Sequence, residues 1–233
     1  MRQSARSTQR MHVENRTQVL EFLKQGRWFG RLPPRLQHLI VEHSRIRSFR
    51  KGGVVISEGA PPRGIYAVLE GRVRSVRRVG DSEEILIYVG EPGFWVGEFA
   101  VLARAPSIGS VVADSAVRSL FLPAVEFERI VEDEPRYFRA FADLLFERHA
   151  LLFRYLVEAG GLAPEEWLRT RLVDLAAMRR NESPTSDPST LTMSQSDLAK
   201  MVGVSRQTLS RMLDRLATRG LIKVGYRSIR VLD

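Results

Sequence analysis

The chain has 233 residues, 44% of them hydrophobic and 27% charged, which is typical of a globular protein with one or two domains. Lys and Arg outnumber Asp and Glu by 36 to 27, and the net charge of +9 favours a polyanionic partner, either nucleic acid or an anionic membrane surface. Cysteine is absent, which excludes disulfides, thiol catalysis, cysteine-bound zinc and iron–sulfur clusters.

The first residues of the chain are polar, lack the apolar core of a secretory signal and contain Arg2, Arg6, Arg10 and Arg16. A solvated tail is the simplest interpretation of this series, and an arm that contacts phosphates is the alternative. No stretch approaches the ~18 apolar residues of a membrane-spanning helix. We therefore expect a cytoplasmic protein without a membrane partner.

Residues 27–123 alternate between short apolar runs and turns rich in Gly, Pro and Asp. The predicted strands span residues 54–56, 65–69, 73–79, 84–89 and 110–113. Gly80-Asp81 is a candidate hairpin tip between two of them. Several short strands at a spacing of about 8–12 residues indicate an all-β barrel or sandwich.

Residues 124–159 contain no glycine and a single proline, Pro135, and two adjacent apolar stripes predict one long helix. The stripes are Phe138, Phe141, Leu145, Arg148, Leu152 and Tyr155, and Ala142, Phe146, His149, Phe153 and Leu156. One stripe can pack on the β domain, and we assign the other, the Phe138 series, to a second subunit related by a two-fold axis. A core helix inside a single chain is the alternative. Gly160-Gly161 are predicted to end the helix and to form a hinge.

Residues 193–222 (MSQSDLAKMVGVSRQTLSRMLDRLATRGLI) predict a helix-turn-helix. A serine can cap the short first helix, and Gly203 permits a tight turn after it. Ser205 can then cap a second helix over residues 206–219, which is narrow enough to enter a major groove.

Flanking elements complete this unit. A helix over residues 165–178 and a Ser/Pro-rich loop over 179–190 precede it. Residues 221–232 alternate around Gly225-Tyr226, as the β-hairpin wing of a winged helix does.

The second helix carries the residues expected to read DNA. Arg206, Gln207 and Arg211 are assigned to base edges, because Arg pairs with guanine and Gln with adenine in the major groove. The expected phosphate contacts are Ser205, Thr208, Ser210, Lys200 and Lys223. The alternative is that these side chains form only a solvated helix face.

Several sequence blocks carry a resemblance to a known family. They are Glu58-Gly59, YAVLEGRV at 66–73, GEPGF at 90–94, Gly97-Glu98 and VGVSRQTLSR at 202–211. With them the chain resembles the Crp/Fnr family of bacterial transcription regulators over nearly its whole length. The resemblance implies an α+β fold with an N-terminal jelly-roll-like β-roll (a double-stranded β-helix), a long dimerisation helix and a C-terminal winged helix-turn-helix.

The same resemblance implies a homodimer that reads a palindromic site in double-stranded DNA, with half-sites about 34 Å apart, and that contacts RNA polymerase. The expected domains are a tail and helix over 1–26, a sensor domain over 27–123, a dimerisation helix over 124–161 and a DNA-binding domain over 162–233. Gln207 stands where other members have Glu, so we expect a different base at one position of each half-site.

The sensor domain departs from the pattern of cyclic-AMP-binding members. Those members follow Gly-Glu with an Arg-Ser pair that clamps the cyclic phosphate. Here Gly97-Glu98 is retained, Ile108-Gly109 takes the place of Arg-Ser, and Leu152-Phe153 takes the place of the polar pair that holds adenine. A buried phosphodiester without a cation would lose its charge-assisted partner. We therefore expect no control by cyclic AMP and a structural role for Glu98.

Other effectors remain open at this point. The candidate effector pocket consists of Gly97, Glu98, Phe99, Ile108, Gly109, Leu152 and Phe153. Its apolar lining could hold a small hydrophobic effector or be filled by its own side chains. Haem would need an axial ligand such as His149, but a lone histidine on an apolar helix face is more often a core residue. We predict no cofactor and no metal.

Two other classes of protein compete with a DNA-binding regulator. An enzyme is not expected, because nucleophile-elbow, P-loop, HExxH and dinucleotide motifs are absent and the adjacent pairs Glu83-Glu84 and Glu165-Glu166 splay apart. A ligand-binding module that acts through protein contacts would carry a degenerate helix-turn-helix. The intact pair of Arg206 and Arg211 favours DNA binding over that alternative.

Overall fold

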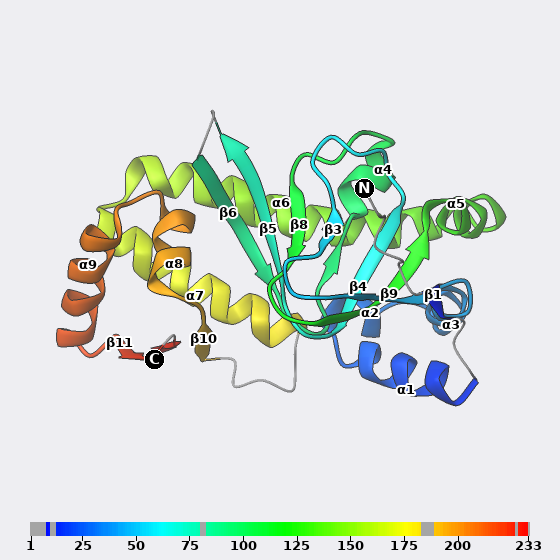
Figure 1. The fold of residues 1–233 in the computed structure, drawn as a ribbon, viewed down its shortest axis with the longest axis horizontal. Helices are drawn as coiled ribbons and strands as arrows, with labels where there is room; N and C mark the ends of the chain where they lie inside the picture. Colours follow the sequence, from blue (N-terminus) through cyan, green and yellow to red (C-terminus); the bar gives the residue numbers. More distant parts are fainter. Residues whose placement is uncertain (1–7, 10–12, 80–82, 183–188, 227, 233) are drawn as a thin grey trace.

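The computed structural model describes residues 8–9, 13–79, 83–182, 189–226 and 228–232. Two antiparallel sheets form a β domain, with strand orders β1-β2-β9-β4-β7 and β3-β8-β5-β6 (Figure 1). The strands of the first sheet are β1 (Thr8–Gln9), β2 (Arg45–Phe49), β4 (Gly64–Glu70), β7 (Trp95–Val96) and β9 (Val117–Pro123). Those of the second are β3 (Val54–Ile56), β5 (Val73–Val79), β6 (Glu83–Gly90) and β8 (Ser110–Ala113).

Strand β4 lies between two hydrophobic cores. Ile65, Ala67 and Leu69 face a core that the first sheet shares with helices. Tyr66 and Val68 face the core between the two sheets. Side chains alternate between the faces of a strand, so a strand buried on both faces reads as a continuous apolar run. The sequence predicted an all-β barrel or sandwich, and the structure forms two sheets packed around a common core.

The structure contains all five predicted strands, with ends that shift by at most one residue. The predicted hairpin tip at Gly80-Asp81 lies outside the described residues, and the strands on either side of it pair as a hairpin would. Strand β2 was missed because of its arginines. Arg45 and Arg47 lie over the Phe121 ring of β9, at 6.0 and 5.2 Å from its centroid. An arginine stacked on an aromatic ring covers apolar surface, but it counts as a charged residue in the hydrophobic pattern by which strands are predicted.

The predicted long helix is in fact two helices. Helix α5 (Ala124–Asp133) ends before Pro135, and α6 (Tyr137–Gly161) begins after it. A residue that precedes proline is driven out of helical geometry, and Glu134 accordingly has φ −143° and ψ 86°. The glycine pair 160–161 forms the last turn of α6, as expected for its end, and Leu162 is extended.

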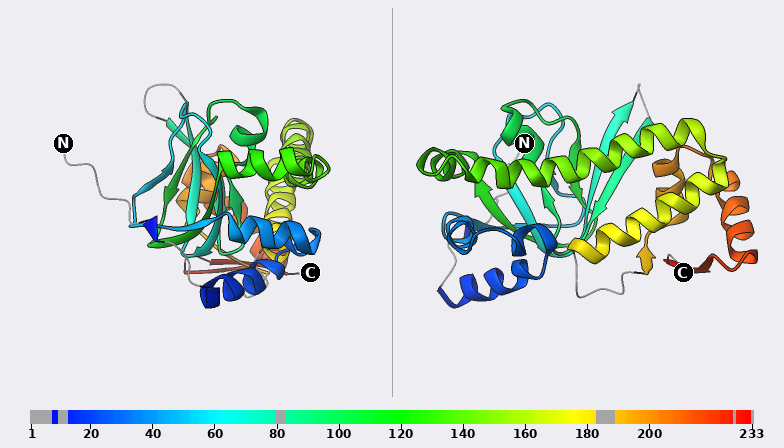
Figure 2. Two further views of the ribbon diagram at one scale, coloured as in Figure 1. Left: turned by 90° about the vertical axis from the view of Figure 1, so that its right-hand side faces the viewer. Right: turned by 180° about the vertical axis from the view of Figure 1, so that it is seen from behind.

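The remaining helices position the two functional ends of the molecule. Helices α1 (Val13–Lys24), α2 (Arg27–Gly30) and α3 (Pro34–Glu42) cover the outer face of the first sheet. Helix α4 (Glu98–Ala103) follows β7 and contacts α6. Helix α6 runs from the β domain to the smaller domain, and α7 (Pro164–Glu182) returns beneath it (Figure 2). Among the described residues, no helix is long and apolar enough to cross a membrane.

The smaller domain is the predicted winged helix-turn-helix. Its elements are α7, β10 (Thr190–Thr192), α8 (Gln195–Val202), α9 (Arg206–Thr218), β11 (Ile222–Gly225) and β12 (Ser228–Val231). Leu168 and Leu172 of α7 pack with Leu198 of α8 and Leu213 of α9 in one core. Helix α7 continues four residues past the predicted end at 178, so the predicted loop begins later, and residues 183–188 of that loop lie outside the described part.

Candidate nucleic-acid interface and effector cavity

Two serines fix the geometry of the helix-turn-helix. Ser194 Oγ accepts a hydrogen bond from Asp197 N at 3.0 Å and caps α8. Gly203 has φ +72°, a left-handed conformation that makes the tight turn. Ser205 Oγ accepts from Thr208 N at 3.1 Å and caps α9. The hydroxyls of Ser205 and Thr208 therefore lie at the positive end of α9, where a phosphate would be favoured.

The three predicted base-reading residues share the exposed N-terminal half of α9. Arg206, Gln207 and Arg211 are exposed, while Leu209 and Leu213 on the opposite side are completely buried. In the described part of the chain, neither Arg206 nor Arg211 has an ion-pair partner. The helix therefore presents two uncommitted guanidinium groups and one amide on a single projecting surface, as base reading requires.

The other predicted phosphate contacts surround this surface. Lys200 of α8 is exposed, and Ser210 of α9 is half-buried. Lys223 is exposed on the wing, where it pairs across the strands with Arg230. Tyr226 at the tip of the wing is 93% exposed. These residues come from three elements and frame the N-terminal half of α9.

A groove between α7 and α9 carries arginines that the sequence analysis did not assign. Its lining includes Arg169, Arg211, Arg215 and Arg219. Arg215 forms an ion pair with Glu165, which ties α9 to α7. The spacing of four residues from 211 to 215 to 219 is the signal that would have placed these arginines on one face of α9.

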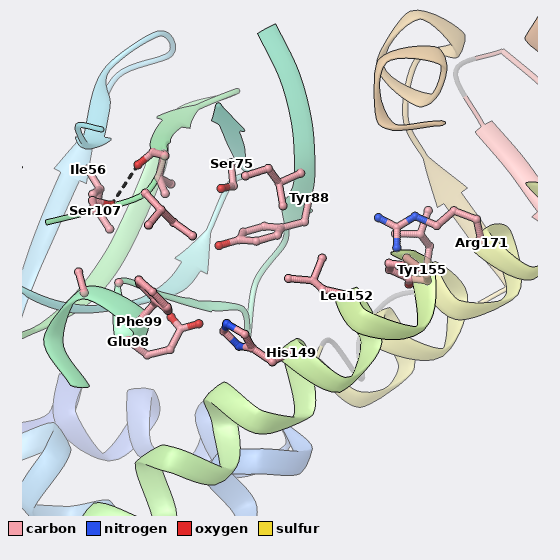
Figure 3. A pocket seen from close by; sticks show the side chains of 17 residues that line it. Ile56, Ser75, Tyr88, Glu98, Phe99, Ser107, His149, Leu152, Tyr155 and Arg171 are labelled. Atoms are coloured by element: carbon pink, nitrogen blue, oxygen red, sulfur yellow. Dashed lines mark hydrogen bonds between the residues drawn. The ribbon is translucent and has the colours of Figure 1, made fainter. Parts of the chain in front are cut away.

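A second site is a cavity in the β domain, between α4, α6 and the sheet that contains β5, β6 and β8 (Figure 3). Its volume is ≈ 110 Å³. The predicted pocket residues that line it are Gly97, Glu98, Phe99, Ile108, Gly109 and Leu152. Phe153 does not line it and is 69% exposed. Consecutive helical residues point about 100° apart, so only one residue of the pair can face the cavity.

The turn before α4 explains why Gly97 and Glu98 occur together. Gly97 has φ +94°, and a Cβ there would lie 2.6 Å from the Gly64 carbonyl oxygen, so only glycine fits. Glu98 follows in the first turn of α4 and is 4% exposed. Its carboxylate therefore lies near the positive end of a helix, at one end of the cavity.

His149 is satisfied by its own surroundings. Its ring stacks on Phe99 with centroids 5.8 Å apart. Its Nδ1 lies 2.9 Å from the Leu145 carbonyl oxygen, to which it donates. These contacts give His149 a packing role in the cavity wall.

The far end of the cavity is closed by a cation that the sequence analysis missed. Arg171 of α7 is 6% exposed, and its guanidinium carbon lies 3.4 Å from the centroid of the Tyr155 ring. Burial lowers the pKa of Arg171 and raises the pKa of Tyr155. Leu168 and Leu175 flank position 171 at helical spacing. An arginine inside an apolar stripe is the signal that would have shown it to be buried.

The β domain also contacts the helix-turn-helix directly. Arg74 Nη2 of β5 lies 2.9 Å from Asp197 Oδ1 of α8. Arg72 Nη1 donates to the Thr192 carbonyl oxygen at 2.9 Å and also pairs with Asp114 of its own domain. The first helix of the helix-turn-helix is therefore attached to a strand whose Ser75 lines the cavity.

The faces of α6 differ from those expected for a dimerisation helix. Phe141 and Tyr155, predicted to contact a second subunit, are 0% and 8% exposed within the chain itself. Of that predicted series, Leu145 is half-buried, Leu152 lines the cavity, Phe138 is 44% exposed, and the side chain of Arg148 lies outside the described part. Among the side chains of α6 that the structure describes, the most exposed apolar ones form another stripe, which we call the outer stripe: Phe146, Phe153 and Val157, at 65%, 69% and 59%.

A β domain with an internal cavity, joined by long helices to an exposed recognition helix and a wing, defines a DNA-binding regulator with a sensor domain. Comparison with known families gives the same division. Residues 46–134 match the cyclic nucleotide-binding domain, and residues 168–233 match the Crp-like helix-turn-helix domain. The chain belongs to the Crp/Fnr family of transcription regulators.

Individual relatives cover most of the chain at low identity. The CRP-like cAMP-activated global transcriptional regulator of Mycobacterium tuberculosis is 24% identical over 79% of this chain and 83% of that protein. The cyclic AMP receptor protein of Thermus thermophilus is 27% identical over 88% and 92%. Among solved structures, FixK2 of Bradyrhizobium japonicum shares the fold with a TM-score of 0.69, at 21% identity over 82% of this chain and 93% of that chain.

Proposed function

We propose that the chain is a homodimeric, sequence-specific transcription regulator that reads a palindromic DNA site without control by cyclic AMP. The observation that carries the proposal is the exposed surface of Arg206, Gln207 and Arg211, with the opposite face of α9 locked in the domain core. The wing and the groove arginines add cations around this surface, which suits a phosphate backbone on both sides of a major groove.

The outer stripe supports the homodimer. Large apolar side chains exposed at helical spacing mark an interaction surface, because water contact with them is unfavourable. Two copies of α6 packed along this stripe would bury Phe146 and Phe153 and leave both recognition helices free. A two-fold dimer of this kind requires two half-sites of opposite orientation.

The residues in place of the phosphate clamp support independence from cyclic AMP. Ile108 and Gly109 stand where a phosphate clamp would need an arginine and a hydroxyl, and most of the remaining lining is apolar. The one cation in the described lining, Arg171, lies at the Tyr155 end and comes from α7 (Figure 3). A cyclic phosphate beside Ile108 would be desolvated without compensation.

Selection of binding sites from random duplex DNA, with and without cyclic AMP, tests the proposal. We expect a palindrome to be enriched by the nucleotide-free protein. Enrichment only in the presence of cyclic AMP would contradict the interpretation of Ile108 and Gly109. Failure to enrich any sequence under both conditions would contradict DNA reading by the ligand-free protein.

Arg206→Ala should weaken binding to the selected site by about 1–3 kcal/mol, because a bidentate contact to guanine is lost. Binding to a scrambled duplex should change much less. Fluorescence anisotropy with both duplexes at one salt concentration measures the difference. Arg219→Ala, at the other end of α9, is the matched control and should weaken both duplexes alike. Equal losses on both duplexes for Arg206→Ala would remove it from base reading.

Gln207→Glu should change the selected base at one position in each half-site. A glutamine amide pairs with adenine or guanine, whereas a carboxylate can only accept, for example from cytosine N4. Repeating the selection with the variant measures the change. An unchanged consensus would show that Gln207 does not read a base.

A further inference from the structure

We propose that the cavity binds an amphipathic carboxylate, with its apolar body against the cavity wall and its carboxylate paired with Arg171. The inference deepens the proposed function, since it assigns a ligand class to the sensor domain. Its test measures ligand binding alone and does not depend on which DNA site the protein reads.

Arg171 is a buried cation that is not fully hydrogen-bonded. The residue is 6% exposed, and its Nη1 atom has no hydrogen-bond partner among the described residues. Arg154 pairs with one oxygen of the nearby Asp174 carboxylate, and the other oxygen, Oδ2, forms no hydrogen bond to Arg171 or to another described residue. Stacking on Tyr155 stabilises the cation but accepts none of its in-plane hydrogen bonds. A buried guanidinium of this kind is stabilised strongly by an anion that arrives from the cavity.

The wall between the two ends of the cavity is mainly apolar. Between Arg171 and α4 the cavity is lined mainly by Ile87, Phe99, Ile108, Val111, Leu152 and Leu175. These side chains offer no hydrogen bonds to a polar ligand body. They favour an alkyl or aryl group, whose burial contributes through the hydrophobic effect.

The side chains at the two ends of the cavity set the direction of a bound anion. Glu98 lies at the opposite end of the cavity from Arg171, and the ring of His149 stands beside it (Figure 3). A carboxylate near Glu98 would be repelled, and one near Arg171 would form a charge-assisted pair. The two ends therefore admit an anionic ligand in one direction only. Ser75 and Tyr88 add polar atoms to the side wall between them.

Arg171 lies where the sensor domain meets the DNA-binding domain. It belongs to α7, whose Leu168 and Leu172 form part of the winged-helix core. Most of the remaining cavity wall belongs to the sensor domain and α6. A ligand held by Arg171 would thus join the sensor domain to the DNA-binding domain across the α6–α7 junction. Binding would stabilise one arrangement of these helices, which is the property that an effector needs.

Isothermal titration of the full-length protein with octanoate, 1-octanol and octylamine tests the inference, because the three probes share one alkyl chain and differ in charge. We expect octanoate to bind about 10-fold to 100-fold more tightly than 1-octanol, with octylamine weakest. Failure of octanoate to bind, or equal affinities for octanoate and 1-octanol, would overturn the proposal. This comparison needs only the natural chain, so it stands even if variants fold poorly.

Two variants of α7 then locate the charge. Arg171→Gln should abolish the preference for octanoate over 1-octanol, and Arg171→Lys should retain part of it. Arg169→Gln, an exposed arginine two residues earlier on α7, is the matched control and should leave the preference unchanged. A preference that survives in Arg171→Gln would overturn the assignment of Arg171. Tight binding of cyclic AMP that is lost in the same variant would replace the carboxylate with a phosphate ligand. The assay contains no DNA, so its failure is distinguishable from failure of the DNA selection.

Discussion

Phe153→Glu should convert the proposed homodimer into monomers. Phe153 is 69% exposed at the centre of the outer stripe, and a two-fold interface contains it twice. Truncation of a central aromatic anchor typically costs about 2 kcal/mol, so two copies cost about 4 kcal/mol, or about 1000-fold in the dissociation constant of the dimer. A buried carboxylate without a partner adds to this cost. Sedimentation velocity over a range of concentrations measures the change.

Phe138→Glu is the informative control for that prediction. Phe138 is an aromatic residue on the same helix and is 44% exposed, but it lies outside the outer stripe. We expect Phe138→Glu to remain dimeric. If Phe138→Glu dissociates the dimer and Phe153→Glu does not, the stripe first predicted from the sequence is the contact and our reassignment is wrong. Monomeric Phe153→Glu should also lose its preference for two half-sites over one, because a monomer presents only one recognition helix.

The DNA-binding domain was well predicted from the sequence because its signals are local. Ser205 caps α9 from one residue before it, and Gly203 makes the turn within the same short segment. The break between α5 and α6 has an equally local cause in Pro135, but the strong apolar periodicity on both sides masked it. A periodic pattern predicts that residues are helical and does not predict that the helix is continuous.

The candidate cavity was predicted only in part, because its closing residue comes from another domain. Gly97, Glu98 and Ile108 lie close together in the sequence and were predicted together. Arg171 is distant from them in the chain, and only the return of α7 beneath α6 brings it to the Tyr155 ring. The contact between Arg74 and Asp197 was missed for the same reason, since a pair 123 residues apart leaves no local pattern.

The helix α6 shows why apolar periodicity alone does not identify a dimer interface. Its two stripes are similarly apolar in sequence, and either could face the chain's own core. The structure separates them, because Trp28 of α2 and Phe127 of α5 pack on Phe141, whereas Phe146 has no comparable cover. Truncation of Phe141 should therefore act on the folding equilibrium, and truncation of Phe146 should act on the association equilibrium.

Phe141→Ala should lower the free energy of unfolding by about 3–5 kcal/mol at every protein concentration. The Phe141 side chain is completely buried, and its ring lies 5.7 Å from the Trp28 ring and 4.9 Å from the Phe127 ring, centroid to centroid. Its removal leaves a cavity that these rigid neighbours fill only in part. Urea denaturation followed by tryptophan fluorescence, which Trp28 should report directly, measures the loss.

Phe146→Ala is the matched control, since it deletes the same side chain five residues further along α6 at a site that is 65% exposed. Its effect on unfolding should be small at low protein concentration and should grow as the dimer becomes the reference state. A loss for Phe141→Ala that disappears at low protein concentration, where the monomer is the reference state, would place Phe141 in the dimer contact after all. A loss that is independent of concentration would assign the inner face of α6 to folding of the sensor domain and leave only the outer stripe for association.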